Sequence, residues 1–287
     1  MLRLRALEVA AVTHCNLMCV GCNHSSPVSE VSFADVAAVD RDFSGLAEVI
    51  EPTYVRVVGG EPLLHPRLDE LIGALRSAMP TSILRVDTNG TRLGKVPTPW
   101  LADIDELQVS VYPGAAVLNT TLRELAAECA NVGTALLVAR FFAFRASRPI
   151  RPLGTAETLQ VFETCQMAHA NSCHVVQDGY VYLCPPSAPS AIGRHQDPSC
   201  PIEPRSTLEI RLSEFLNRDE PLTKCQDCLG TVGTPIPHTM ASRKTWVELS
   251  SRGEIDYAHM SALRQDPHSD NFCSVGEVWS RGARDLA

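Results

Sequence analysis

The sequence predicts an α/β fold around a parallel sheet, because strand and helix patterns alternate over its first two-thirds. Short β-branched runs lie at 7–12, 54–58, 83–86, 107–112 and 134–141. Apolar residues at helical spacing lie between most of these runs. Single helices between strands imply right-handed crossovers, and the repeated strand–helix rhythm indicates a full or partial TIM-like barrel. In such folds the working side chains lie at the carboxyl ends of the strands.

Local signals mark where the helices begin and end. Ser32 with Asp35 predicts a capping-box start for the helix after the first strand. Pro80 ends the second helix. Thr121 and Glu124 predict the start of the helix before the fifth strand.

Composition and charge exclude several classes of protein. The net charge is −8, from 25 basic and 33 acidic residues. This argues against a nucleic-acid partner, which favours a basic face. No run of about 18 apolar residues is present, and the amino terminus lacks the pattern of a signal peptide. We therefore expect no membrane span and a cytoplasmic location.

The cysteines divide the chain into regions. The sequence has 11 cysteines and no secretion signal, which favours metal ligation over a disulfide framework. The strand–helix rhythm fades near residue 145, and cysteines and turn residues dominate from Cys165 onward. We predict a core domain at 1–155, a cysteine-rich module at 156–232, and a segment of unassigned role at 233–287.

A compact cysteine motif follows the first strand. Cys15, Cys19 and Cys22 have the spacing C-x3-C-x2-C. Three thiolates on one loop can each bind one iron of a [4Fe–4S] cube, which leaves the fourth iron open for another ligand. The alternative is a zinc site, for which two C-x2-C pairs are usual.

This motif directly after a first strand resembles the radical SAM (S-adenosylmethionine) superfamily. The resemblance implies a partial TIM-like (βα)6 barrel and a cluster that cleaves SAM to methionine and a 5′-deoxyadenosyl radical. That radical removes a hydrogen atom from the substrate. An electron donor such as flavodoxin or ferredoxin is implied as a partner.

Further residues match the resemblance at the ends of later strands. Gly59-Gly60-Glu61-Pro62 closes the second strand, where the superfamily carries a motif whose backbone binds the methionine amino group of SAM. Glycine permits the close backbone approach that such binding needs. An ordinary strand–helix turn is the alternative.

Four polar residues are weaker candidates for binding SAM. Asn89 and Ser110 lie at barrel-mouth positions that often contact the SAM ribose in the superfamily, although ordinary turn and strand polarity explains them equally well. Arg140 or Arg145 offers a bidentate fork for a carboxylate, or is a solvated surface arginine.

A second set of cysteines lies downstream, at Cys165, Cys184, Cys225 and Cys228. An Asp-Gly turn at 178–179 predicts a hairpin that draws its flanking cysteines together. The pattern resembles the SPASM and Twitch auxiliary-cluster modules of radical SAM enzymes. Four thiolates would complete one auxiliary [4Fe–4S] cluster of the Twitch type. A structural zinc site is the alternative.

The other cysteines have less certain roles. Cys173 competes with Cys165 as the first auxiliary ligand, and the spacing favours Cys165. Cys129 lies on an apolar helix stripe and is most simply a core residue. Cys200 is given no role. Cys273 is either a hydrogen-atom donor to a substrate radical, as in some epimerases of the superfamily, or a free thiol.

The resemblance extends from the first strand to Cys228 and does not identify the substrate. We expect dehydrogenation or epimerisation of a small molecule such as a sugar, an aminocyclitol or a related secondary metabolite. One alternative is a peptide-modifying enzyme that matures a ribosomal peptide. Another, of a different class, is a non-catalytic metal-binding scaffold.

Overall fold

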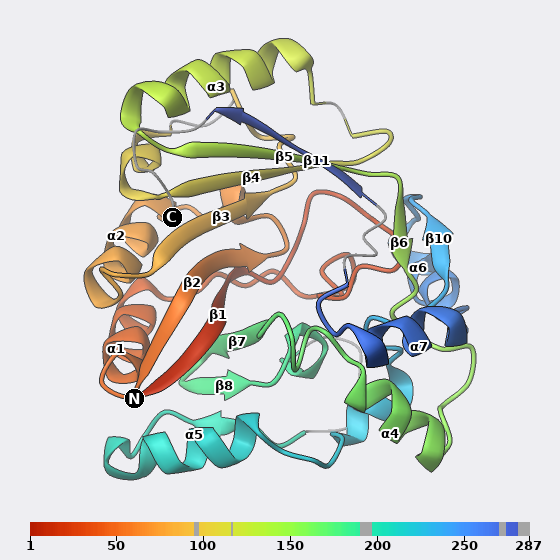
Figure 1. Ribbon diagram of the computed structural model, residues 1–287. Helices are drawn as coiled ribbons and strands as arrows, with labels where there is room; N and C mark the ends of the chain where they lie inside the picture. Colours follow the sequence, from red (N-terminus) through yellow and green to blue (C-terminus); the bar gives the residue numbers. More distant parts are fainter. Residues whose placement is uncertain (95–97, 116, 190–196, 270–273, 281–287) are drawn as a thin grey trace.

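A central sheet organises the protein (Figure 1), and its described strands run in the order β11-β5-β4-β3-β2-β1-β7-β8-β9. The computed structural model describes residues 1–94, 98–115, 117–189, 197–269 and 274–280. Strands β1 to β5 and β7 are parallel, and β8, β9 and β11 extend the sheet as antiparallel strands. The predicted α/β fold with a mostly parallel sheet is therefore confirmed.

The described strands are β1 (Leu2–Val12), β2 (Ile50–Gly59), β3 (Ile83–Thr88), β4 (Glu106–Val111), β5 (Ala135–Phe141), β6 (Ala143–Arg145), β7 (His174–Gln177), β8 (Tyr180–Tyr182), β9 (Cys200–Pro201), β10 (Pro235–Pro237) and β11 (Ser274–Ser280). The described α-helices are α1 (Val36–Leu46), α2 (Leu68–Ala78), α3 (Asn119–Val132), α4 (Thr155–Glu163), α5 (Leu208–Leu216), α6 (Arg243–Ser250) and α7 (Tyr257–Gln265).

The structure corrects two helix starts that the sequence suggested. Asp35 is itself the N-cap of α1, and its carboxylate accepts a hydrogen bond from the backbone N–H of Ala38, so the capping box with Ser32 is wrong. Helix α3 begins at Asn119, two residues before Thr121. A 3-10 turn at Pro99–Asp103 stands between β3 and β4, where a barrel repeat would place an α-helix.

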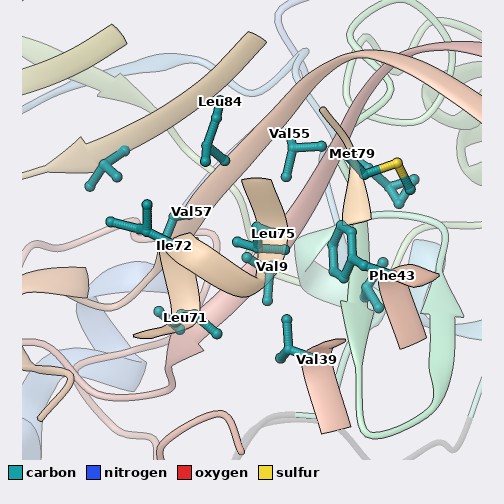
Figure 2. Close-up of a cluster of buried hydrophobic side chains, with 14 of the residues drawn as sticks. Val9, Val39, Phe43, Val55, Val57, Leu71, Ile72, Leu75, Met79 and Leu84 are labelled. Carbon is teal, nitrogen blue, oxygen red and sulfur yellow. The ribbon is translucent and has the colours of Figure 1, made fainter. Parts of the chain in front are cut away.

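One face of the sheet carries the main core. Side chains of β1, β2 and β3 pack against α1 and α2, where Phe43, Leu71 and Ile72 are fully buried (Figure 2). Helices α3 and α5 contribute to the same cluster through Leu122 and Leu212. Burial of this face fixes the sheet, and with it the positions at which the strands end.

The predicted cysteine-rich module is continuous with the sheet. The hairpin of β7 and β8 turns at Asp178 and Gly179, which both have positive φ (52° and 80°), as a tight primed turn needs. Strand β7 pairs in parallel with β1, with Leu7 opposite His174. The sheet therefore crosses the expected boundary near residue 155, and the division into three domains stays a prediction.

The carboxyl-terminal segment returns to the core. Strand β11 pairs antiparallel with β5, and α6 and α7 lie on the side of the sheet away from α1 and α2 (Figure 1). None of the described helices has both the length and the hydropathy that a membrane crossing requires.

Candidate iron–sulfur and S-adenosylmethionine site

The three cysteines of the first motif lie on the loop that follows β1. Cys19 is buried, while Cys15 and Cys22 are half-buried. Burial raises the pKa of the Cys15 thiol to about 11 and that of Cys19 to about 12, and the charge of the Cys22 thiolate adds to both shifts. The thiols thus lie within electrostatic reach of one another. Their thiolate forms need a neighbouring cation, and an iron–sulfur cluster provides that compensation.

The backbone of residues 60 and 61 is hydrogen-bonded to the end of β1 and to the start of the cysteine loop. Gly60 N–H donates to the carbonyl of Val12 (2.9 Å), and Glu61 N–H donates to the carbonyl of His14 (3.1 Å). A Cβ atom at Gly60 would lie 1.7 Å from the His14 oxygen, so no larger residue fits. Gly59 has a φ angle of +126°, a backbone conformation that residues with a side chain rarely adopt. Both glycines are therefore required to bring β2 against the cysteine loop.

Glu61 faces the protein interior. Its carboxylate is fully buried and accepts hydrogen bonds from Thr88 Oγ1 (2.5 Å), Asn89 N (2.7 Å) and Leu63 N (3.1 Å). This side chain ties the end of β2 to the end of β3. Its buried neighbour Pro62 opens a 3-10 turn. A contact of these residues with SAM stays a prediction.

Asn89 connects that network to the cysteine loop. Its Nδ2 donates to Asn16 Oδ1 (2.9 Å) and lies 3.5 Å from Cys15 Sγ. Asn89 is 6% exposed. An amide fixed beside a candidate cluster ligand is consistent with the expected place of Asn89 near SAM.

The other two candidates lie farther along the sheet. Ser110 is buried on β4 and interacts with Tyr112. Arg140 on β5 pairs with Glu277 of β11 (3.1 Å) and contacts Asn119. Its guanidinium is thus engaged by protein groups, and Arg145 is similarly paired with Asp256 (3.1 Å). SAM binding by these residues stays a prediction.

The four cysteines of the second set come together from separate elements. Cys165 follows α4, Cys184 follows β8, and Cys225 and Cys228 lie in and after a 3-10 turn at Thr223–Asp227. Burial raises the pKa of Cys165 to about 11 and that of Cys225 to about 12, and the Cys228 thiolate contributes to both. Burial raises the pKa of Cys184 well above its usual value, and the charges of Cys165, Cys228 and Cys225 add to that shift.

Cys173 has partly different neighbours. Its thiol lies 4.0 Å from Arg56 Nη1 and interacts first with Glu8 on β1 and less strongly with Cys165. Gly230, by contrast, packs against Cys165, where an added Cβ would lie 3.1 Å from Sγ. These contacts favour Cys165 over Cys173 as the fourth member, and the assignment as metal ligands stays a prediction.

Within the described part of the chain, no group of three or more histidine, cysteine or acidic residues is placed to hold a single metal ion. In a [4Fe–4S] cube each thiolate binds a different iron. Cys129 is fully buried in the core, as expected, and Cys273 lies outside the described residues.

Three aromatic rings lie near the cysteine loop, and no sequence pattern predicted that they would. Burial raises the pKa of Tyr112 and the charge of Cys19 adds to the shift, so its hydroxyl lies within electrostatic reach of the cysteine loop. His238 stacks on Tyr112 with ring centroids 4.9 Å apart, and Phe144 packs edge-on against both. Only the return of β10 to β6 brings residue 238 here.

A cleft lies between the cysteine loop and the β7–β8 hairpin. No Asp, Glu, Lys or Arg is among the described residues that line it. Burial lowers the pKa of His24 to about 4, so this imidazole is neutral near pH 7. The lining residues are Ala10, Val12, Thr13, His24, Ser26, Ser29, Gly59, Val175, Gln177, Pro185, Ala188 and Pro189.

Comparison with known proteins identifies relatives over part of the chain. No protein-family model matches it. A GTP 3′,8-cyclase from Trichormus variabilis is 31% identical over 94 residues, and one from Pectobacterium atrosepticum is 31% identical over 113 residues. These matches cover 31% and 37% of this chain and 29% and 33% of the relatives. The recognition of the chain as a radical SAM relative is confirmed.

Solved structures with a similar arrangement include BtrN in complex with AdoMet and 2-DOIA, with a TM-score of 0.47 and 18% identity over 75% of this chain and 83% of that one. A second is anSMEcpe with AdoMet and a peptide, with a TM-score of 0.42 and 12% identity over 92% of this chain and 99% of that one. The SPASM or Twitch assignment stays a prediction.

Proposed function

We propose, from this kinship with radical SAM enzymes, that the chain cleaves SAM and removes a hydrogen atom from an uncharged, hydroxyl-rich small molecule. The observation that carries the proposal is the three-thiol loop seated on the Gly59-Gly60 backbone. When bound, a [4Fe–4S] cluster supplies the electron that splits SAM into methionine and a 5′-deoxyadenosyl radical. Cys15, Cys19 and Cys22 would hold that cluster, and Asn89 orients Cys15.

The cleft supports the choice of substrate class. Transfer of an ionised group from water into a site without a paired charge is costly. A cleft whose described lining has no charged side chain therefore disfavours a nucleoside triphosphate. Serine, threonine, glutamine and neutral histidine suit hydroxyl groups, as on a sugar. The GTP 3′,8-cyclases match less than two-fifths of this chain, and their substrate is not proposed for it.

The fate of the substrate radical separates two outcomes. After the hydrogen atom is removed from C–H(OH), the remaining C•(OH) radical can lose one electron and one proton to become a carbonyl. The net change is a two-electron dehydrogenation with SAM as the consumed oxidant. Gain of a hydrogen atom from a thiol on the opposite face gives an epimer, and Cys273 is the candidate donor. We favour dehydrogenation, because the second cysteine set would hold an electron acceptor of the iron–sulfur class. Reaction in D2O separates the outcomes: an epimer gains deuterium at carbon, and a dehydrogenated product is two mass units lighter.

Anaerobic reconstitution with iron and sulfide, followed by dithionite and SAM, tests the proposal. We expect 5′-deoxyadenosine on chromatography, formed faster when a substrate polyol is added. A reconstituted protein that binds iron but leaves SAM intact would instead support a metal-binding scaffold. Acceleration by a peptide encoded beside this gene, and by no polyol, would favour the peptide-modifying alternative.

A further inference from the structure

The carboxyl-terminal segment makes direct contacts with the first cysteine loop. Val20 N–H donates to the carbonyl of Thr239 (2.9 Å), and Ala241 N–H donates to the carbonyl of Met18 (3.0 Å). These two bonds place Met240 opposite Cys19 in an antiparallel bridge. The cysteine loop is thus paired along its backbone with residues more than 200 positions away.

Helix α6 adds side-chain contacts from one of its faces. Trp246 is fully buried, and its Nε1–H donates to the carbonyl of Cys19 (2.7 Å). Ser250, which is 2% exposed, accepts from Gly21 N–H (3.1 Å). Arg243 donates to the carbonyl of Val28 (2.8 Å). Positions 243, 246 and 250 share one helix face, since they are three and four residues apart.

We propose that residues 239–250 form a clasp that positions the cysteine loop, with Trp246 as its principal positioning residue. The inference rests on the proposed function, because it assigns the clasp to the cluster that this loop would hold. A loop with three thiolates repels itself, and backbone bonds from outside the loop hold its carbonyls and thiols in one arrangement. By reciprocity, a loaded loop stabilises the clasp as much as the clasp stabilises the loaded loop.

The proposal predicts a measurable coupling. In protein that keeps the unaltered 239–250 segment, reconstitution should slow amide hydrogen exchange in residues 239–250, while helix α7 serves as an internal reference. Trp246→Phe keeps an aromatic ring and removes the indole donor. We expect this variant to release cluster iron to a chelator about tenfold faster, which corresponds to about 1.4 kcal/mol and is typical of one lost hydrogen bond.

The matched control is Val247→Ala, because Val247 is exposed on the same helix. It should release iron at the wild-type rate. Ser250→Ala provides a smaller change if Trp246→Phe fails to fold, and it should also accelerate release. Both measurements use protein in which Cys225 and Cys228 are replaced by alanine, so that only the first site is counted.

Two results would overturn the clasp. One is exchange in 239–250 that reconstitution leaves unchanged; the other is iron release within twofold of wild type for both Trp246→Phe and Ser250→Ala. Failure of the proposed function would look different, because the wild type would then leave SAM intact, with or without iron at Cys15, Cys19 and Cys22. If no iron binds, amide exchange of the apo protein tests the clasp, which requires faster exchange of residues 15–22 in Trp246→Phe than in Val247→Ala.

Discussion

The two cysteine groups are built in opposite ways. The first lies within eight consecutive residues on one loop, and that loop is held by β1, by the Gly59-Gly60 backbone and by the clasp. The second draws its thiols from stretches that are up to 63 positions apart, between Cys165 and Cys228. The first group depends on spacing and support, whereas the second depends on correct packing of the whole module.

The difference bears on which changes each group tolerates. The first needs a backbone that approaches closely, so it is sensitive to atoms added beneath the loop. The second needs the hairpin, α4 and the turn at Thr223–Asp227 to remain docked, so it is sensitive to the strand that ties them to the sheet.

Replacing Cys15, Cys19 and Cys22 together by alanine should abolish 5′-deoxyadenosine formation, because each supplies one thiolate. The wild type should bind about eight irons, four per cube, and the triple variant about four. Chromatography and iron analysis measure both quantities. Cys200→Ala, outside both groups, is the control. Undiminished SAM cleavage in the triple variant would contradict the site.

Gly60→Ala should disrupt the first group and spare the second. The added Cβ would lie 1.7 Å from the His14 oxygen, and the three atoms nearest to it all belong to the backbone, which cannot move aside as a flexible side chain could. We expect a loss of roughly 3 kcal/mol in the free energy of unfolding and loss of iron from the first site only.

The matched control is Gly73→Ala in helix α2, where no atom lies within 4 Å of the added Cβ. That change should stabilise the protein by about 0.5–1 kcal/mol, since alanine is the better helix former. Urea unfolding of the apo proteins measures both variants. Equal effects of the two substitutions would show that close approach at Gly60 is unimportant.

Cys165→Ala and Cys173→Ala should differ at the second site. The Cys165 variant should lose about four irons, because this thiol lies with Cys184, Cys225 and Cys228. The Cys173 variant should keep them, because its thiol faces Arg56 and Glu8. Iron analysis decides, and the reverse pattern would exchange the two assignments.

Mild acid should destabilise β7, the strand that joins the second cysteine group to β1. Burial lowers the pKa of His174, the first residue of β7, from 6.5 to about 4. The unfolded chain therefore binds the proton more readily, and stability is lost as the pH falls from 6.5 toward 4. The loss is at most about 3 kcal/mol.

His174→Gln should remove this part of the pH dependence of the free energy of unfolding, measured by urea titration at pH 6.5 and 4.5. His268→Gln is the control, because His268 is exposed. A wild-type and a His174→Gln protein with parallel pH dependence would refute the linkage.

The sequence by itself predicted the first cysteine group and determined the mostly parallel sheet. The spacing of cysteines within one loop can be read without the tertiary structure, so Cys15, Cys19 and Cys22 were recognisable at once. The pattern of apolar and β-branched residues located β1 to β5. The Asp-Gly turn likewise predicted the hairpin at 178–179. In each case the signal and its consequence lie within a few residues.

Only the tertiary structure decided what surrounds the site. Trp246 and His238 lie in a segment of weak periodicity, and no local pattern indicates that they reach Cys19 and Tyr112. The inward orientation of Glu61 depends on donors from β3, and the pairing of Arg140 depends on β11. Such contacts join residues far apart in the chain, and they form because the packed sheet brings distant segments together.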